Sequence, residues 1–190
     1  LGMYKNGHCG MTGTSSEDEF EEIYGMPTYR VDTRKKNIRI DYDKVYLTKE
    51  EKYKAIIDDI LECYKSGRPI LVGTESISES KIISDILKEK CITHNLLNAE
   101  NAAQEASIVA TAGQYGSITI ATNMAGRGTD IQLGPGVVEL GGLKVIGTSH
   151  NIAKRIDDQL RGRTSRQGKP GETVYYCSLE DELIVKDGSL

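Results

Sequence analysis

The chain has 190 residues, a length that suits one α/β domain with room for a loosely attached end. Hydrophobic residues make up 38% and charged residues 27%, which excludes an intrinsically disordered chain. The formal net charge of −4 provides no overall attraction for nucleic acids or anionic lipids, and no apolar run is long enough to span a bilayer.

The cysteines and histidines are scattered, and none pairs with another ligand at the spacing of a zinc or redox motif. We therefore expect reduced, mostly structural thiols in a cytosolic protein, and no metal site. The residues concerned are Cys9, Cys63, Cys91, Cys177, His8, His94 and His150.

Three features mark the first third of the chain. The acidic run at 17–22 is typical of a solvated helix face. Residues 27–46, which are basic around Arg34, predict an extended connector or edge strands. The longest helical pattern covers 48–67, where Thr48 followed by Glu51 predicts a capping box.

From residue 68 onward, apolar and β-branched runs alternate with helical patterns. This alternation predicts an α/β fold whose mainly parallel sheet is covered by helices on both faces. We expect 1–47 to hold a connector and the first strand region, and 48–190 to form the main core. The expected strands lie at 69–73, 94–97, 117–121, 143–147 and 173–177, and the expected helices at 76–90, 102–112 and 153–161.

A first arginine-bearing block, residues 122–131, follows directly on an expected strand. Its glycines permit close backbone approaches, and Arg127 supplies donors suited to phosphate oxygens. Asp130 could accept hydrogen bonds from ribose hydroxyls or hold Arg127 in position. The alternative is a tight strand-to-helix turn with an internal Arg–Asp pair.

A second block, residues 159–168, begins at the end of an expected helix. Arg163 and Arg166 stand three residues apart, so on a helical or turn-like backbone they project in similar directions. Two such guanidiniums suit the charge on a transferring γ-phosphoryl group. A solvated basic helix end is the alternative. The sequence contains no Gly-x-x-x-x-Gly-Lys-Ser/Thr loop, so it predicts only half of an ATP site.

The blocks resemble, in order, the second nucleotide-binding fold of the SecA family, the ATPase motors of bacterial preprotein export. The likeness covers nearly the whole chain, and Ala-Thr-Asn-Met-Ala-Gly-Arg-Gly-Thr-Asp-Ile is its most specific motif. It implies a single three-layer RecA-like domain over 1–190, cut from a longer protein, that closes over ATP held by a preceding domain. The segments are 10–14, 71–74, 97–99, 122–131, 141–148, 155–163 and 178–181.

The resemblance also implies roles for individual residues. Arg163 and Arg166 are similar to the family's arginines that sense or stabilise the γ-phosphate. Residues expected to contact ATP or ADP are Gly126, Arg127, Thr129 and Asp130, and residues expected to couple hydrolysis to movement are Thr12, Gly13, Thr14 and Gln159.

The same resemblance implies partners and a location. These are the first nucleotide-binding and the C-terminal domains of the same protein, a SecYEG-type channel and preproteins, without nucleic acid. Mg²⁺ would be held by the missing first domain. The full-length protein is expected in the cytoplasm and peripherally on the cytoplasmic face of the bacterial membrane.

Three segments depart from the family pattern and favour an accessory SecA, and one of them, the segment before Gly10, matches it poorly. Ser165 replaces the second glycine of Gly-Arg-Ser-Gly-Arg, which keeps both arginines but affects their turn. Residues 149–153 replace a more charged stretch. Two other classes of function remain open: the C-terminal half of a superfamily-two nucleic-acid helicase, and a non-catalytic interaction module.

Overall fold

The structure is a computed structural model that describes residues 9–97, 105–122 and 129–187. The chain divides into two compact units, Leu1–Asp32 and Thr33–Leu190. The single domain expected over the whole chain therefore stays a prediction, and each unit is described by itself.

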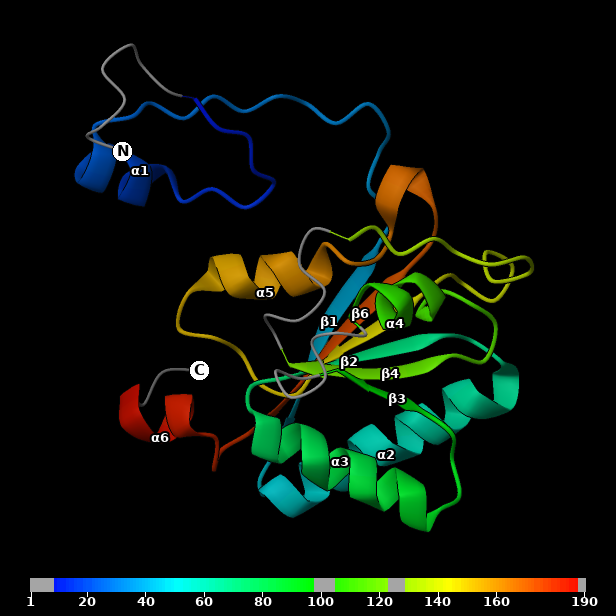
Figure 1. The fold of residues 1–190 in the computed structure, drawn as a ribbon. Coiled ribbons are helices and arrows are strands. Elements are labelled where there is room, and N and C mark those ends of the chain that lie inside the picture. The colour runs from blue at the N-terminus through cyan, green and yellow to red at the C-terminus, as the bar shows by residue number, and fades with distance from the viewer. Residues whose placement is uncertain (1–8, 98–104, 123–128, 188–190) are drawn as a thin grey trace. The chain divides into compact units, whose positions relative to one another are not determined.

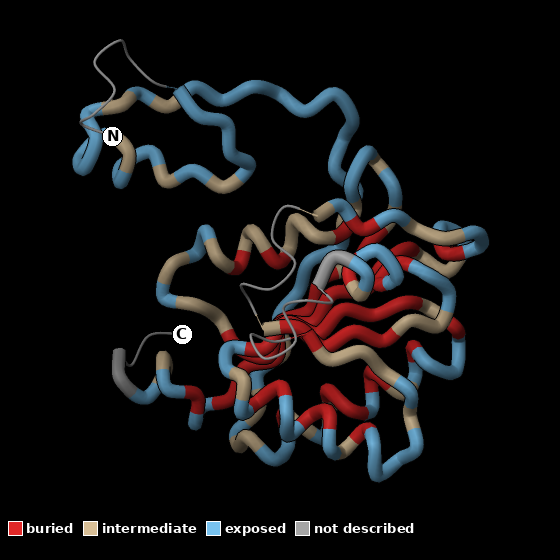
Figure 2. Tube along the Cα trace, viewed as in Figure 1, coloured by how far each residue is buried: buried red, intermediate tan, exposed pale blue. Residues whose placement is uncertain are grey.

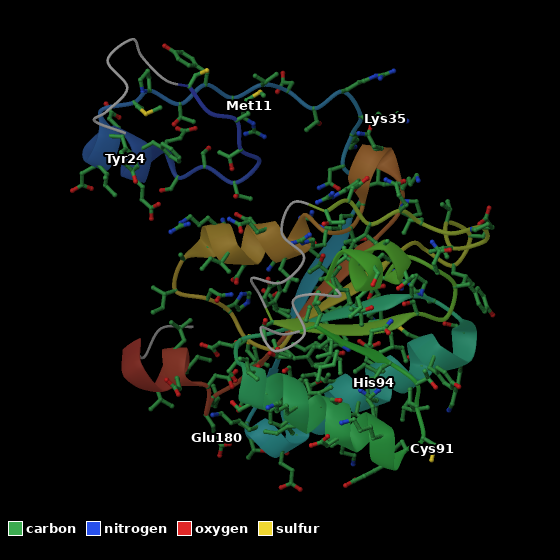
Figure 3. All side chains as sticks on the ribbon, in the orientation of Figure 1. Met11, Tyr24, Lys35, Cys91, His94 and Glu180 are labelled. Carbon is green, nitrogen blue, oxygen red and sulfur yellow. The ribbon has the colours of Figure 1, made fainter. Side chains whose placement is uncertain are left out.

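The first unit contains one short helix, α1 (Glu17–Tyr24), which ends at Gly25 in the left-handed conformation. Its first turn carries three acidic residues, as favoured by the helix dipole. None of residues 9–32 is buried, and Met11 and Tyr24, labelled in Figure 3, are exposed. The acidic run is thus a solvated helix face, as predicted.

The second unit is built on a six-stranded sheet in which every strand pair is parallel. The spatial order is β1-β6-β5-β2-β4-β3, so β1 lies at one edge (Figure 1). The sheet confirms the α/β class with a parallel sheet, and β1 shows that part of 27–46 is an edge strand. The strands are β1 (Ile40–Tyr46), β2 (Ile70–Thr74), β3 (Asn95–Leu97), β4 (Ile118–Thr122), β5 (Lys144–Gly147) and β6 (Glu172–Ser178).

Helices cover both faces of this sheet (Figure 1). On one face α2 and α3 pack against the strands, and on the other α4 and α5 do so. A helix not expected from the sequence, α6, follows β6. None of the described helices is long and apolar enough to cross a membrane. Their bounds are α2 (Lys49–Ser66), α3 (Ile77–Glu89), α4 (Glu105–Thr111), α5 (Lys154–Arg161) and α6 (Glu182–Asp187), with the 3₁₀ helix η2 at Arg166–Gly168.

The core consists of two apolar clusters, one on each side of the sheet, with the strands buried between them (Figure 2). Alternate residues of one strand serve opposite clusters: Ile70 and Val72 face α2, whereas Leu71 faces α4 and α5. Burial on both faces explains why the central strands are continuously apolar in sequence.

The boundaries of α2 follow from its end residues. The Thr48 side chain accepts a hydrogen bond from the Glu51 backbone N–H, and the Glu51 carboxylate accepts one from the Thr48 N–H. This is the predicted capping box. Gly67 ends the helix at φ 74°, a conformation that a side chain would disfavour.

Buried ion pairs tie the helices to the ends of the strands. Lys144 at the start of β5 lies 2.6 Å from Asp59 of α2 and 3.1 Å from Glu172 of β6. Arg68 lies 2.6 Å from the same Glu172 carboxylate. Partial burial raises the pKa of Glu172, but hydrogen bonds from the Tyr42 hydroxyl and Arg68, together with the charges of Lys144 and Arg68, lower it to about 2.

Candidate functional site

The second arginine block folds as a tight turn after α5. Gly162 caps the helix, and the buried Thr164 hydroxyl donates to the Leu143 carbonyl at 2.6 Å. Ser165 adopts the left-handed conformation at φ 57°, and its hydroxyl donates to the Lys169 carbonyl at 2.7 Å. A glycine adopts that conformation without steric cost, which accounts for the glycine in the family pattern. The direction of the arginines is thus set by a turn.

The turn brings the second block into contact with the end of the first. Arg166 Nη1 lies 2.5 Å from Asp130 Oδ1, and Arg166 Nε donates to the Gly162 carbonyl at 2.8 Å. Arg163 Nη1 donates to the Thr129 carbonyl at 3.3 Å. Four of the predicted site residues therefore lie together, although the members of the two pairs are 34 and 36 positions apart in sequence.

The Arg166–Asp130 pair is exposed, with 43% and 50% of the two side chains accessible to solvent. An exposed pair contributes about 0–1 kcal/mol, so a phosphate group could replace the carboxylate at little cost. Gln132 also donates to the Asp130 carboxylate. Asp130 therefore pairs with Arg166 at the surface, and the Arg166 guanidinium stays accessible to another anion.

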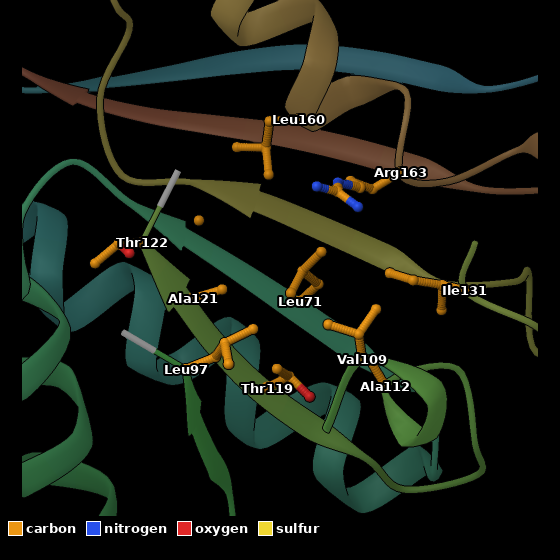
Figure 4. A pocket seen from close by; sticks show the side chains of 11 residues that line it. Leu71, Leu97, Val109, Ala112, Thr119, Ala121, Thr122, Ile131, Leu160 and Arg163 are labelled. Carbon is orange, nitrogen blue, oxygen red and sulfur yellow. The ribbon is translucent and has the colours of Figure 1, made fainter. Parts of the chain in front are cut away.

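Arg163 differs from Arg166 because it is half-buried. It lines a small, largely apolar cavity of about 20 Å³ between the sheet and the segments that cover it (Figure 4). Figure 4 shows its guanidinium beside Leu160 of α5 and across from Leu71 of β2. The apolar walls lower the local polarity beside the guanidinium, which strengthens its interaction with an anion.

Of the other predicted site residues, only Gln159 lies in the described part of the second unit. Gly126 and Arg127 lie outside the described residues, so the expected Asp130–Arg127 pair stays a prediction. Gln159 is half-buried in α5. Thr12, Gly13 and Thr14 belong to the first unit, where the Thr12 hydroxyl accepts the Thr14 N–H at 3.1 Å.

Sequence reasoning missed the residues that fix the end of α5. Arg39 Nη1 donates to the Arg161 carbonyl at 3.1 Å, and Arg39 pairs with Asp41 at 2.5 Å. Arg161 itself lies 3.3 Å from Asp43 and 4.7 Å from the ring centre of Tyr175. The basic composition of 34–39 indicates that this segment could bind an acidic or carbonyl partner, but nothing in the sequence indicates that it contacts α5.

The part of the chain described by the structure holds no group of three His, Cys, Asp or Glu side chains that could bind a metal ion. At the arginine turn the carboxylate of Asp130 is occupied by Arg166. This donor set suits an anion, because two guanidiniums outnumber one carboxylate.

A six-stranded parallel sheet with helices on both faces, and an arginine-bearing turn that meets Thr129 and Asp130, has the fold of RecA-like second domains. Solved structures agree with that class. One match is a chain of the crystal structure of the E. coli DEAD-box protein SrmB bound to regulator of ribonuclease activity A, with a TM-score of 0.60 and 18% identity over 79% of this chain and 83% of that chain. Another is Mss116p DEAD-box helicase domain 2 bound to an RNA duplex, with a TM-score of 0.52 and 19% identity over 76% of this chain and 56% of that one. Both show a shared fold.

The chain belongs to the SecA P-loop domain family, because the sequence model of that family matches residues 36–137 and 135–189. It is 56% identical over 184 residues to the protein translocase subunit SecA of Caldicellulosiruptor saccharolyticus, covering 95% of this chain and 22% of that protein. The corresponding subunit of Thermotoga maritima is 55% identical over 184 residues, covering 95% of this chain and 21% of that protein. The resemblance seen in the motifs is confirmed. The chain spans about a fifth of the length of these relatives.

Proposed function

We propose that the chain is the second nucleotide-binding domain of a SecA-type ATPase that moves preproteins across the bacterial cytoplasmic membrane. The observation that carries the proposal is the meeting of Arg163 and Arg166 with Thr129 and Asp130 on one face of the domain. The 56% sequence identity to a protein translocase subunit SecA supports a SecA-type motor as the class of ATPase. In this proposal the face closes over ATP bound by another domain.

Each arginine has a distinct part in the proposed hydrolysis. Arg163, held by the Thr129 carbonyl and flanked by apolar walls, would stabilise charge that develops on the γ-phosphoryl oxygens. Arg166 exchanges the exposed Asp130 carboxylate for phosphate when the two domains close. Gly126, Arg127, Thr129 and Asp130 are proposed to contact the nucleotide, and Thr12, Gly13, Thr14 and Gln159 to couple it to movement.

The proposal includes partners that supply the rest of the site. A first nucleotide-binding domain would contribute the phosphate-binding lysine and the acidic ligands of Mg²⁺. The motor would act with C-terminal domains of its own chain, a SecYEG-type channel and unfolded preproteins, at the cytoplasmic face of the membrane. The 190-residue chain alone is therefore expected to have negligible ATPase activity.

The test is steady-state ATPase activity of the full-length protein carrying Arg163→Ala or Arg166→Ala. Each substitution should depress turnover strongly, by at most roughly 10³–10⁵-fold, the range of arginine fingers. Lys88→Ala is the matched control, because Lys88 is an exposed cation on α3 paired only locally with Asp85. Activity in both arginine variants equal to that of the control would refute the proposed site and would favour a non-catalytic module.

A nucleic-acid helicase is the competing proposal, because the fold is shared with DEAD-box domains. Salt-dependent binding of RNA or DNA by the full-length protein would favour it, since phosphate contacts release counterions. The net charge of −4 argues against such binding. Stimulation of ATPase activity by an unfolded preprotein, and not by RNA, would favour the SecA-type motor.

A further inference from the structure

His150 occupies an unusual position in the loop between β5 and α5. Its ring stacks on the buried Tyr175 ring, with centroids 4.4 Å apart and planes 9° from parallel. Nδ1 lies 2.7 Å from Asp157 Oδ2, and Nε2 lies 3.5 Å from Asp43 Oδ2. The imidazole thus stands between two carboxylates, one from α5 and one from the edge strand β1.

Helix α5 needs such a contact at its beginning. Its N-cap is Ala153, which makes no side-chain capping bond, and alanine is among the poor N-cap residues. Asp157 in the first turn instead accepts from the Asn151 N–H at 3.0 Å, from the Asn151 side chain at 2.7 Å and from His150. Asp157 thus ties the preceding loop to the first turn of α5.

The other end of α5 is joined to the same group of residues. Arg161 in the last turn lies 3.3 Å from Asp43, the carboxylate that also faces His150. Arg161 and His150 both lie against the Tyr175 ring, whose hydroxyl donates to the Asp157 carbonyl at 3.1 Å. Asp43 and Tyr175 therefore connect the two ends of the helix, and Arg163 follows two residues after Arg161.

The charges that face His150 favour its protonated form. The Asp157 carboxylate from α5 makes the largest contribution, and the Cys177 thiol from β6 adds to it, while burial opposes both. Asp43 from β1 and Arg161 from α5 are the other charged groups nearby. The interactions with Asp157 and Cys177 raise the pKa of His150 from 6.5 to about 10, which favours the cation at neutral pH.

We propose that His150 is a positioning residue, a cation that clamps α5 between Asp157 and Asp43 and thereby holds Arg163 and Arg166 in place for the nucleotide. The link to the nucleotide rests on the proposed function, whereas the clamp itself does not. A simple packing role would require only the stacked ring. It would not require a charge, and that difference can be tested.

The first measurement uses the unmodified chain. The His150 ring signals, followed by NMR against pH, should show the charged form up to a pH of about 10. His94 is the internal control, because its two ring nitrogens hydrogen-bond to the Ser84 hydroxyl and the Ile92 carbonyl beside α3 and not to a carboxylate (Figure 3). A His150 ring that titrates near 6.5 would overturn the clamp, and this outcome needs no variant that must fold.

The second measurement compares two substitutions. His150→Gln keeps a hydrogen-bonding group but removes the charge, so backbone amides of α5 should exchange with solvent about 10-fold faster. His150→Arg restores both a charge and a planar group that stacks on tyrosine, so it should restore protection. His94→Gln should leave α5 unchanged. Equal exchange in the Gln variant and the wild type would overturn the clamp.

The third measurement connects the clamp to function in the full-length protein. His150→Gln should lower kcat for ATP hydrolysis about 10-fold with less than a twofold change in KM, and His150→Arg should recover kcat. Faster exchange of α5 with unchanged kcat would overturn the positioning role. A wild-type full-length protein without ATPase activity would instead refute the proposed function, and the NMR and exchange results would then decide the clamp alone.

Discussion

Lys52 offers a sharp test of how the second unit is stabilised, because its ammonium group is buried at 1% exposure. Nζ lies 2.6 Å from Asp181 Oδ1 and donates to the Thr148 carbonyl at 2.9 Å, with Glu79 at 4.0 Å. Lys52→Met keeps nearly the same length of side chain but removes the charge. The buried Asp181 carboxylate then retains the Ser178 N–H at 2.8 Å as a donor and loses its counter-charge.

The expected cost follows from the burial of both partners. Breaking a buried ion pair by removing one partner costs about 3–5 kcal/mol of unfolding free energy, because the other charge stays buried and uncompensated. For a unit of this size each kcal/mol lowers Tm by about 2–4 °C, so we expect a fall of about 6–20 °C. Asp181→Asn should cost a similar amount, and the double variant should cost less than the two single costs added together.

The assay is urea denaturation followed by far-UV circular dichroism, with the m-value compared between variants. Lys88→Met is the matched control, because Lys88 and Asp85 form a Lys–Asp pair of 2.9 Å whose side chains are 64% and 67% exposed. That control should change stability by less than about 0.5 kcal/mol. A Lys52→Met variant that loses less than 1 kcal/mol, or no more than the control, would refute the reasoning from burial.

Three further substitutions test the left-handed turn at Ser165, the close packing of Gly147 on Tyr175, and the titration of Glu172. Ser165→Val should unfold at least about 2 kcal/mol more easily than Ser165→Gly, since a β-branched residue is strained at φ 57°; equal stability by urea denaturation would contradict the strained turn. Gly147→Ala should cost about 1–3 kcal/mol, because a new Cβ would lie 2.3 Å from the buried Tyr175 ring; a neutral result by thermal denaturation would show that the ring moves freely. Glu172 has a pKa lowered from 4.5 to about 2, so its contribution to stability is present above pH 4.5 and lost as the pH falls towards 2. Glu172→Gln should therefore flatten the acid limb of Tm against pH, and an unchanged limb would exclude Glu172 as a cause.

Much of the fold could be predicted from the sequence because its signals are local. The five strands expected after residue 68 all form, and Thr48 and Glu51 make the capping box that their spacing predicts. Continuous apolar runs such as 69–73 identify strands buried on both faces. The helix α6 was missed because it has only six residues, too few for a helical period to stand out.

The residue types of the candidate site could be predicted from the sequence, but the contacts between them could not. The arginine blocks were recognised from residue types and glycine spacing, yet the pairing of Arg166 with Asp130 joins segments 36 positions apart. Asp157 looks like an ordinary acidic residue in a first helical turn, and no spacing rule connects it with His150 seven residues earlier. The clamp around Tyr175 further depends on β1, which is distant in sequence from α5.

The sequence by itself determined the alternation of strands and helices and the family, because these depend on local pattern and motif. Only the tertiary structure decided which charges meet. Parallel pairing of β1 with β6 carries Asp43 to the helix that follows β5, and the segment after α5 brings Arg163 to Thr129 and Arg166 to Asp130. Such contacts arise from long-range packing, which local periodicity does not encode.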